Sequence, residues 1–152
     1  MTYADPLPDP QTQPDFYDSV PAKRAIAWIV DLAMTVVLAA ILSVPFALFG
    51  IVLILPLLFL PLIWACTGFV YRWLTLAQGS ATWGMRLMSI ELRDSSGHRI
   101  DGTTALLHTA GTYVSFAIFP LQLVSVASMV LSERGQGLTD MVLGTTMLNR
   151  SA

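Results

Sequence analysis

The hydrophobic pattern of this chain is dominated by forty consecutive residues without a formally charged side chain, from Leu32 to Tyr71. One continuous helix of that length would be roughly 60 Å long, about twice the hydrocarbon core of a bilayer. The pattern therefore predicts two membrane spans, at about residues 25–46 and 51–73. Pro45 and Gly50 mark the turn between them, where so few polar residues occur that we expect a tight hairpin.

Small residues recur every four positions in the first span, at Ala39, Ser43 and Ala47. This spacing lets two helix backbones approach closely, so it predicts a packing face for the second span or for a partner helix. In the second span, Pro56 and Pro61 are expected to bend the helix, with neighbouring helices satisfying the freed carbonyl groups.

A third uncharged run follows at residues 102–132, and its apolar part covers about 104–131. One tilted span would fit this length. Pro120 lies in the middle, however, and interrupts the helical hydrogen-bond ladder. A re-entrant hairpin of two short arms is the alternative, provided that other helices shield it from lipid. The pattern leaves both arrangements open and favours the broken one.

Two short segments are typical of β-strands. From Arg86 to Arg93 polar and apolar residues alternate with a period of two, and residues 141–148 are rich in β-branched side chains. A lone strand is unstable in water, so we expect the two to pair in a small cytoplasmic β element. Residues 79–84, before the first strand, predict a loop or a short interfacial turn.

The basic residues predict the orientation. Lys23 and Arg24 precede the first span and no Lys or Arg lies between the spans, whereas several follow the second: Arg72, Arg86, Arg93 and Arg99. By the positive-inside rule both flanks of the hairpin are cytoplasmic. We therefore expect a multi-pass protein of the plasma membrane with a cytoplasmic N-terminus.

Composition narrows the class further. Apolar residues make up 55% of the chain and charged residues 12%, far below the charged share of soluble domains. The net charge of −2, without a basic patch, predicts no nucleic-acid partner. The single cysteine, Cys66, excludes a disulfide within the chain and is expected to be a small buried hydrophobic residue. The acidic, proline-rich residues 1–21 lack the features of a signal peptide and predict a disordered or polyproline-like arm.

Three charged residues are candidates for chemistry. Arg24 and Asp31 are seven residues apart and share a helix face, with Asp31 further inside the apolar region. A carboxylate there costs about 2.5–3.5 kcal/mol on insertion scales, so it must find a donor, a water-filled cavity or a proton. Asp140 follows a glycine-containing turn near Arg134, and it either caps that turn or joins Asp31 with Arg24 or Arg86 in one buried charge network.

His108 begins the third apolar segment, where it either forms hydrogen bonds at the interface or titrates near neutrality. No cluster of His, Cys and carboxylate residues has metal-ligand spacing, and no nucleophile motif is present. We therefore expect neither catalysis nor a cofactor.

Three blocks of the sequence resemble the RDD family, over about residues 20–149. They are Arg24…Asp31, Gly79-Ser80-Ala81-Thr82-Trp83-Gly84-Met85-Arg86-Leu87, and Gly137-Leu138-Thr139-Asp140-Met141-Val142-Leu143-Gly144-Thr145. The resemblance implies that Arg24 is the family arginine, Asp31 its first aspartate and Asp140 its second. It also implies a small bacterial inner-membrane protein, for which transport has been suggested. The chain departs from the family pattern at Met85, Thr139 and His108.

The expected architecture is an all-α integral membrane protein. An N-terminal arm, residues 1–21, precedes an RDD-like membrane domain, residues 22–149, and a tail, residues 150–152. Two or three short spans enclose little volume, so we expect association with other membrane subunits or with further copies. We expect the protein to be an accessory or scaffold subunit of a larger membrane assembly. The alternative is an oligomeric transporter, for cation/proton exchange or another solute, that uses Asp31 as its titrating group.

Overall fold

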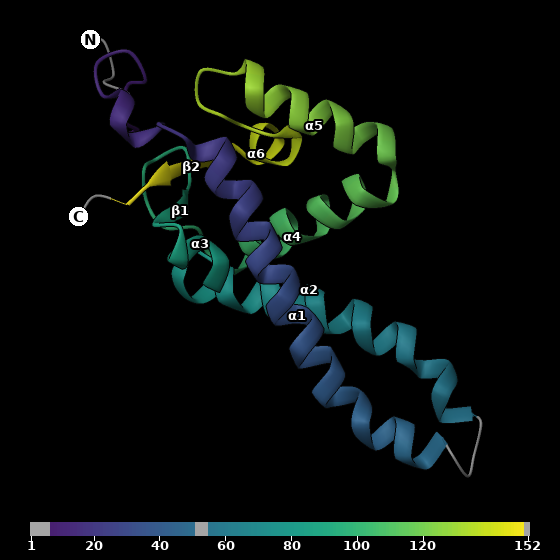
Figure 1. Cartoon of the computed structure of the whole chain (residues 1–152). Helices are drawn as coiled ribbons and strands as arrows, with labels where there is room; N and C mark the ends of the chain where they lie inside the picture. Colours follow the sequence, from purple (N-terminus) through teal and green to yellow (C-terminus); the bar gives the residue numbers. More distant parts are fainter. Residues whose placement is uncertain (1–6, 51–54, 151–152) are drawn as a thin grey trace.

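The computed structural model describes residues 7–50 and 55–150 (Figure 1). This part of the chain is mostly helical, with one small antiparallel sheet. In chain order its elements are η1 Pro14–Phe16, α1 Val20–Gly50, η2 Leu55–Phe59, α2 Leu60–Gly79, α3 Trp83–Leu87, β1 Ile90–Arg93, α4 Gly102–Ala117, α5 Phe119–Leu131, α6 Leu138–Leu143 and β2 Thr146–Asn149.

The long helices α1 and α2 form the predicted hairpin. Two helical segments in the described part, Pro14–Gly50 and Leu57–Gly79, are long and apolar enough to cross a membrane, which confirms two membrane-length apolar helices. Of the two residues expected at the turn, Pro45 lies within α1 and Gly50 ends it, and residues 51–54 lie outside the described residues. The second helix continues six residues beyond the predicted end at residue 73 and stops at Gly79, where Ser80 takes a left-handed conformation.

Pro45 and Pro61 do not act as expected. Pro45 lies inside α1 rather than at its end. Pro61 lies in the first turn of α2, where the missing N–H group breaks no helical hydrogen bond. Pro61 therefore begins this helix instead of bending it.

The third apolar segment is broken near Pro120. Helices α4 and α5 meet at an angle of 117°, and Pro120 lies in the first turn of α5. Asp101 caps the N-terminus of α4, because its carboxylate accepts a hydrogen bond from the backbone N–H of Thr104 at 2.7 Å. The break agrees with the sequence, and whether the segment re-enters or spans the membrane stays a prediction.

Strands β1 and β2 pair antiparallel, with Ile90 opposite Asn149 and Arg93 opposite Thr146. The small sheet is therefore confirmed, although both strands are shorter than predicted. Residues 83–87 form the helix α3 instead, because the Thr82 hydroxyl caps it by accepting a hydrogen bond from the Met85 N–H. The first part of the second predicted strand is the helix α6, which ends at Gly144 in a left-handed conformation.

The hydrophobic core lies where α1 begins and α2 ends, at the end of the hairpin that carries the sheet (Figure 1). From residue 7 onward the N-terminal arm lies against this end. The apolar side chain of Leu7 is buried, and the Asn149 side-chain amide donates to the backbone oxygens of Asp15 and Asp18. Lys23 also donates to the Asn149 side chain, at 2.7 Å.

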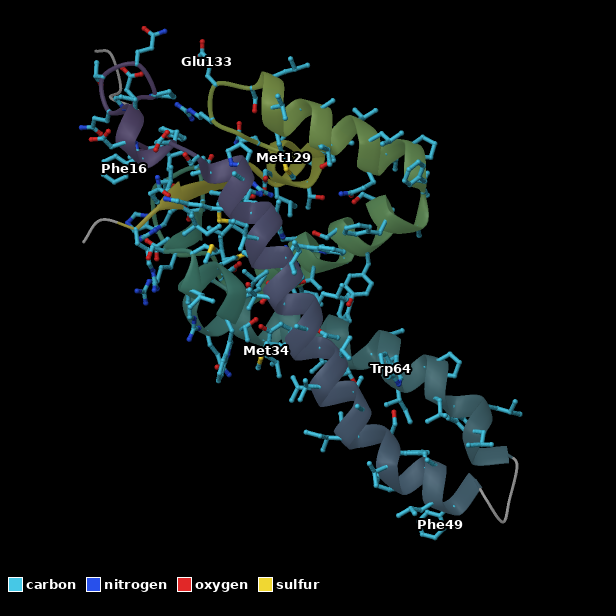
Figure 2. All side chains as sticks on the ribbon, viewed as in Figure 1. Phe16, Met34, Phe49, Trp64, Met129 and Glu133 are labelled. Carbon is cyan, nitrogen blue, oxygen red and sulfur yellow. The ribbon has the colours of Figure 1, made fainter. Side chains whose placement is uncertain are left out.

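The far half of the hairpin has a different character. Figure 2 shows its side chains, Phe49 among them, radiating outward from the two helices. Of the three small residues at four-residue spacing, Ala39 is buried, Ser43 is half-buried and Ala47 is exposed. Cys66 is exposed as well, against expectation, because it lies on the outer face of α2.

Candidate functional site

Asp31 is anchored by three uncharged donors. Its carboxylate accepts hydrogen bonds from the Tyr71 hydroxyl at 2.7 Å, the Thr82 hydroxyl at 2.5 Å and the Gly84 backbone N–H at 2.9 Å. Tyr71 lies on α2, whereas Thr82 and Gly84 belong to the start of α3. The buried Asp31 carboxylate on α1 thus connects three elements. Hydroxyl and backbone N–H groups take the place of the arginine that was expected as its partner.

The contact between α1 and α3 depends on Gly84. A Cβ atom at this position would overlap the backbone oxygen of Ala27 and lie 2.9 Å from the Asp31 Oδ1 atom. Only a residue without a side chain lets the start of α3 approach α1 this closely. The Gly84 N–H can therefore reach the carboxylate.

Asp140 forms the second anchor. Arg24 Nη1 lies 2.6 Å from its Oδ2 atom and His108 Nε2 lies 2.8 Å from its Oδ1 atom, while the Gly137 N–H also donates to it. Asp140 is fully buried on α6. Its contacts with Arg24 and His108 join α6 to α1 and α4. Burial alone would raise the pKa of Asp140, but the charge of Arg24 and the bond from His108 lower that pKa well below its usual range.

Arg86, another of the predicted charged residues, donates to neither aspartate of these anchors. Arg86 is exposed, and its Nε–H group donates to the Ala81 carbonyl oxygen at 3.2 Å. Arg134 is half-buried in the turn between α5 and α6. Among the described residues, Asp31 and Asp140 therefore occupy two separate hydrogen-bonded anchors instead of sharing one arginine.

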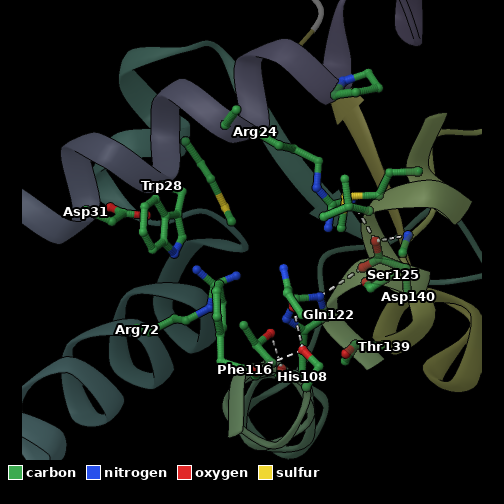
Figure 3. Close-up of a pocket in the computed structure, with 18 of the residues that line it drawn as sticks. Arg24, Trp28, Asp31, Arg72, His108, Phe116, Gln122, Ser125, Thr139 and Asp140 are labelled. Carbon is green, nitrogen blue, oxygen red and sulfur yellow. Dashed lines mark hydrogen bonds and ion pairs between the residues drawn. The ribbon is translucent and has the colours of Figure 1, made fainter. Parts of the chain in front are cut away.

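A cavity of about 470 Å³ connects the two anchors (Figure 3). Arg24, Asp31, His108 and Asp140 all border it. Arg72 of α2 reaches into the same space, and among the described residues its buried Nε atom has no hydrogen-bond partner.

Sequence reasoning missed the role of Arg72, because it placed the end of the second span at residue 73 and read this arginine as a flanking residue. The position of the helix end was the signal that could have shown Arg72 to lie within the span. The first glycine after Arg72 is Gly79, so a helix that continues to it places Arg72 about two turns inside its end. Tyr71 was missed for the same reason.

No group of three or more His, Cys, Asp or Glu residues in the described part of the chain is arranged to hold a metal ion. The cavity is instead bordered by two arginines, one histidine, two anchored carboxylates and several neutral polar side chains. Chemically, it can accommodate a polar group beside an apolar wall.

Comparison with known proteins gives one match. The model of the RDD family matches residues 19–144, a range that includes Arg24, Asp31 and Asp140. No curated protein and no solved structure matches the chain. The family match confirms the resemblance carried by the three sequence blocks.

Proposed function

Because the chain belongs to the RDD family and contains two apolar helices of membrane length, we propose that it acts as an accessory or scaffold subunit of a larger membrane assembly. The observation that carries this proposal is the far half of the hairpin. Of the described elements, only α1, η2 and the first turns of α2 form it (Figure 1). Large apolar side chains are exposed there, including Leu48, Phe49 and Leu58 at 63%, 67% and 70%.

Two helices without a third beside them enclose no polar path. A solute that crosses the bilayer would need partners along this half of the hairpin, so a single copy does not provide a route. The exposed small residue Ala47 leaves room for the close approach of another helix. Packing against other membrane helices therefore suits this surface.

The buried charges fit the same role. Asp31 and Asp140 each accept hydrogen bonds from partners on at least two other segments of the chain. A carboxylate engaged in this way fixes helices relative to one another. We infer that the three residues of the family name stabilise the subunit and shape the surface that it presents.

The exposed cysteine permits a direct test in native membranes. Cys66 is the only cysteine of the chain, and it lies on the outer face of α2. A thiol-reactive crosslinker of short reach should yield one discrete product of higher mass, and the same partner should co-purify at a fixed ratio in mild detergent. Cys66→Ser should abolish the crosslink without changing the co-purification.

A second variant maps the partner surface. In the Cys66→Ser background, Val142→Cys moves the thiol to an exposed position on α6. If the hairpin is the partner surface, the new thiol should give a weaker or different product. A protein that stays monomeric in detergent, and that gives no discrete product from either position in membranes, would contradict the proposal.

Transport is the second candidate, because Asp31 and Asp140 border one cavity. Exchange at Asp31 would require an ion to displace three donors, which is why we place this function second. Proton-coupled cation flux in reconstituted vesicles, abolished by Asp31→Asn but unchanged by Asp15→Asn at an exposed site, would establish it. Flux that persists in Asp31→Asn would remove Asp31 from the mechanism.

A further inference from the structure

We propose that the cavity beside Arg72 binds an amphiphilic anion, with its phosphate or carboxylate head at Arg72 and its apolar part toward the mouth of the cavity. The starting point is the guanidinium group itself. It carries five N–H donors and no acceptor, and it projects from α2 into the cavity (Figure 3). Its Nε atom is buried without an acceptor within the described ranges. A buried N–H group without an acceptor is unfavourable, so this edge of the guanidinium calls for one.

The neighbouring carboxylates do not fill this role. Asp140 is engaged by Arg24 and His108, and Asp31 by Tyr71, Thr82 and Gly84. The two negative charges balance those of Arg24 and Arg72 overall. Neither aspartate accepts a hydrogen bond from the Arg72 Nε–H group in this part of the structure.

Neutral donors face the same space. Gln122 of α5 lines the cavity, and its Oε1 atom accepts a hydrogen bond from the Ser115 hydroxyl at 2.8 Å. Ser115 has one hydroxyl hydrogen and also lies 2.9 Å from the Thr112 carbonyl oxygen, so this bond does not fix the orientation of the amide. In either orientation at least one N–H group of Gln122 remains for a ligand. The Ser125 oxygen accepts from the Leu138 N–H at 3.1 Å, which leaves its hydroxyl hydrogen to donate. An oxyanion would accept from all three side chains.

The mouth of the cavity is apolar. Ile29 of α1, Val126 and Val130 of α5 line it and are also 60%, 49% and 72% exposed, so the cavity opens between α1 and α5. Trp28 and Phe116 stack with ring centroids 5.9 Å apart and form a flat wall beside it. A volume of about 470 Å³ holds a head group and the first part of an apolar chain.

These features distinguish the ligand class. A cation entering the cavity would meet the guanidinium groups of Arg24 and Arg72, whereas a free phosphate ion would leave the apolar mouth unused. An anionic head group on an apolar chain would contact both the guanidinium of Arg72 and the apolar mouth of the cavity. Such a ligand can be a phospholipid with a phosphomonoester head or a fatty acid, which share an oxyanion that accepts several hydrogen bonds.

Binding is tested on the full-length protein in a non-ionic detergent, which presents no anionic head group of its own. The probes are a short-chain phosphatidic acid, decanoate, inorganic phosphate, and a diacylglycerol of the same chain length as the uncharged control. The readouts are tryptophan fluorescence, because Trp28 lines the cavity, and the melting temperature. We expect saturable binding and a raised melting temperature with phosphatidic acid or decanoate, and neither with diacylglycerol. The stronger of the two anions identifies the head group.

Matched arginine variants give the critical comparison. Arg72→Gln should weaken binding about tenfold or more, since charge-assisted hydrogen bonds to the oxyanion are lost. Arg99→Gln makes the same charge change at an exposed site and should bind like the wild type. The melting temperature of ligand-free Arg72→Gln is measured alongside, so that a folded variant makes the loss of binding a local effect. Val126→Trp keeps Arg72 and should obstruct the mouth.

Several outcomes would overturn the proposal. They are equal binding by wild type and Arg72→Gln, equal weakening by Arg99→Gln, binding of diacylglycerol as tight as that of phosphatidic acid, or unchanged binding in Val126→Trp. Binding of inorganic phosphate as tight as that of phosphatidic acid would refute the amphiphilic part. Because each measurement is made on the isolated chain, its result is independent of whether the protein belongs to a larger assembly.

Discussion

The two ends of the α1–α2 hairpin are held together by different interactions. At the end that carries the sheet, the buried carboxylates of Asp31 and Asp140 join α1 to α2, α3, α4 and α6. At the far end the two helices meet chiefly through apolar side chains. The polar contact found there among the described residues joins Trp64 Nε1 to the Ser43 hydroxyl, at 3.1 Å.

The difference follows from the solvent. Lipid tails are as apolar as leucine, so apolar contact alone gives helices in a bilayer little reason to prefer one another over lipid. A buried carboxylate has no such alternative, since it must find donors within the protein. The charged end therefore specifies which helices meet, and the far end remains an adaptable surface for lipid or another subunit.

The largest effect is expected from Asp140→Asn. The substitution leaves Arg24 without its anionic partner in a buried site, and breaking a buried pair in this way costs about 3–5 kcal/mol. We expect the free energy of unfolding to fall by that amount, measured by reversible denaturation in mixed micelles. Asp15→Asn, the same change at an exposed site in the arm, should have an effect below about 0.5 kcal/mol. Similar losses in both variants would show that the Asp140 anchor contributes no more to stability than an exposed carboxylate.

Hydrophobic pattern predicted the hairpin, the break near Pro120 and the two short strands, because each element depends on local sequence. The pairing of the strands followed because each was the only obvious partner of the other. The partners of Asp31 could not be read in the same way. They lie 40, 51 and 53 positions further along the chain, and only the fold brings them together. Helical spacing correctly placed Arg24 on the face that borders the cavity with Asp31, but Arg24 binds Asp140 of α6.

Local signals also competed with one another. The alternation from Arg86 onward favoured a strand, whereas the hydroxyl of Thr82 caps a helix over residues 83–87 and delays the strand to Ile90. The end of α2 shows the same problem, since no pattern of apolar residues distinguished a helix end at residue 73 from one at Gly79. That difference of six residues decided whether Arg72 was read as a flanking residue or as part of the cavity.

A smaller effect is expected where α1 and α3 touch. Gly84→Ala places a methyl group against the backbone oxygen of Ala27, so α3 must move away from Asp31. Overpacking of this kind costs about 1–3 kcal/mol, and we expect a loss in that range in the same denaturation assay. Gly102→Ala is the matched control, because no heavy atom lies within 4 Å of the added methyl group. Its effect should be near zero or slightly stabilising, and a loss equal to that of Gly84→Ala would contradict the importance of the close approach.

The smallest effect is expected at the far end, from Ser43→Ala. The hydroxyl of Ser43 donates to the Ala39 carbonyl and accepts from Trp64, but interhelical hydrogen bonds in membrane proteins average only about 0.6 kcal/mol. A double-mutant cycle with Trp64→Phe isolates the coupling between the two side chains. We expect a coupling energy of about 0.6 kcal/mol, several times below the loss in Asp140→Asn. A coupling of the same size as that loss would mean that the far end is fastened as firmly as the charged end, and the hairpin would then be a rigid rod rather than an adaptable surface.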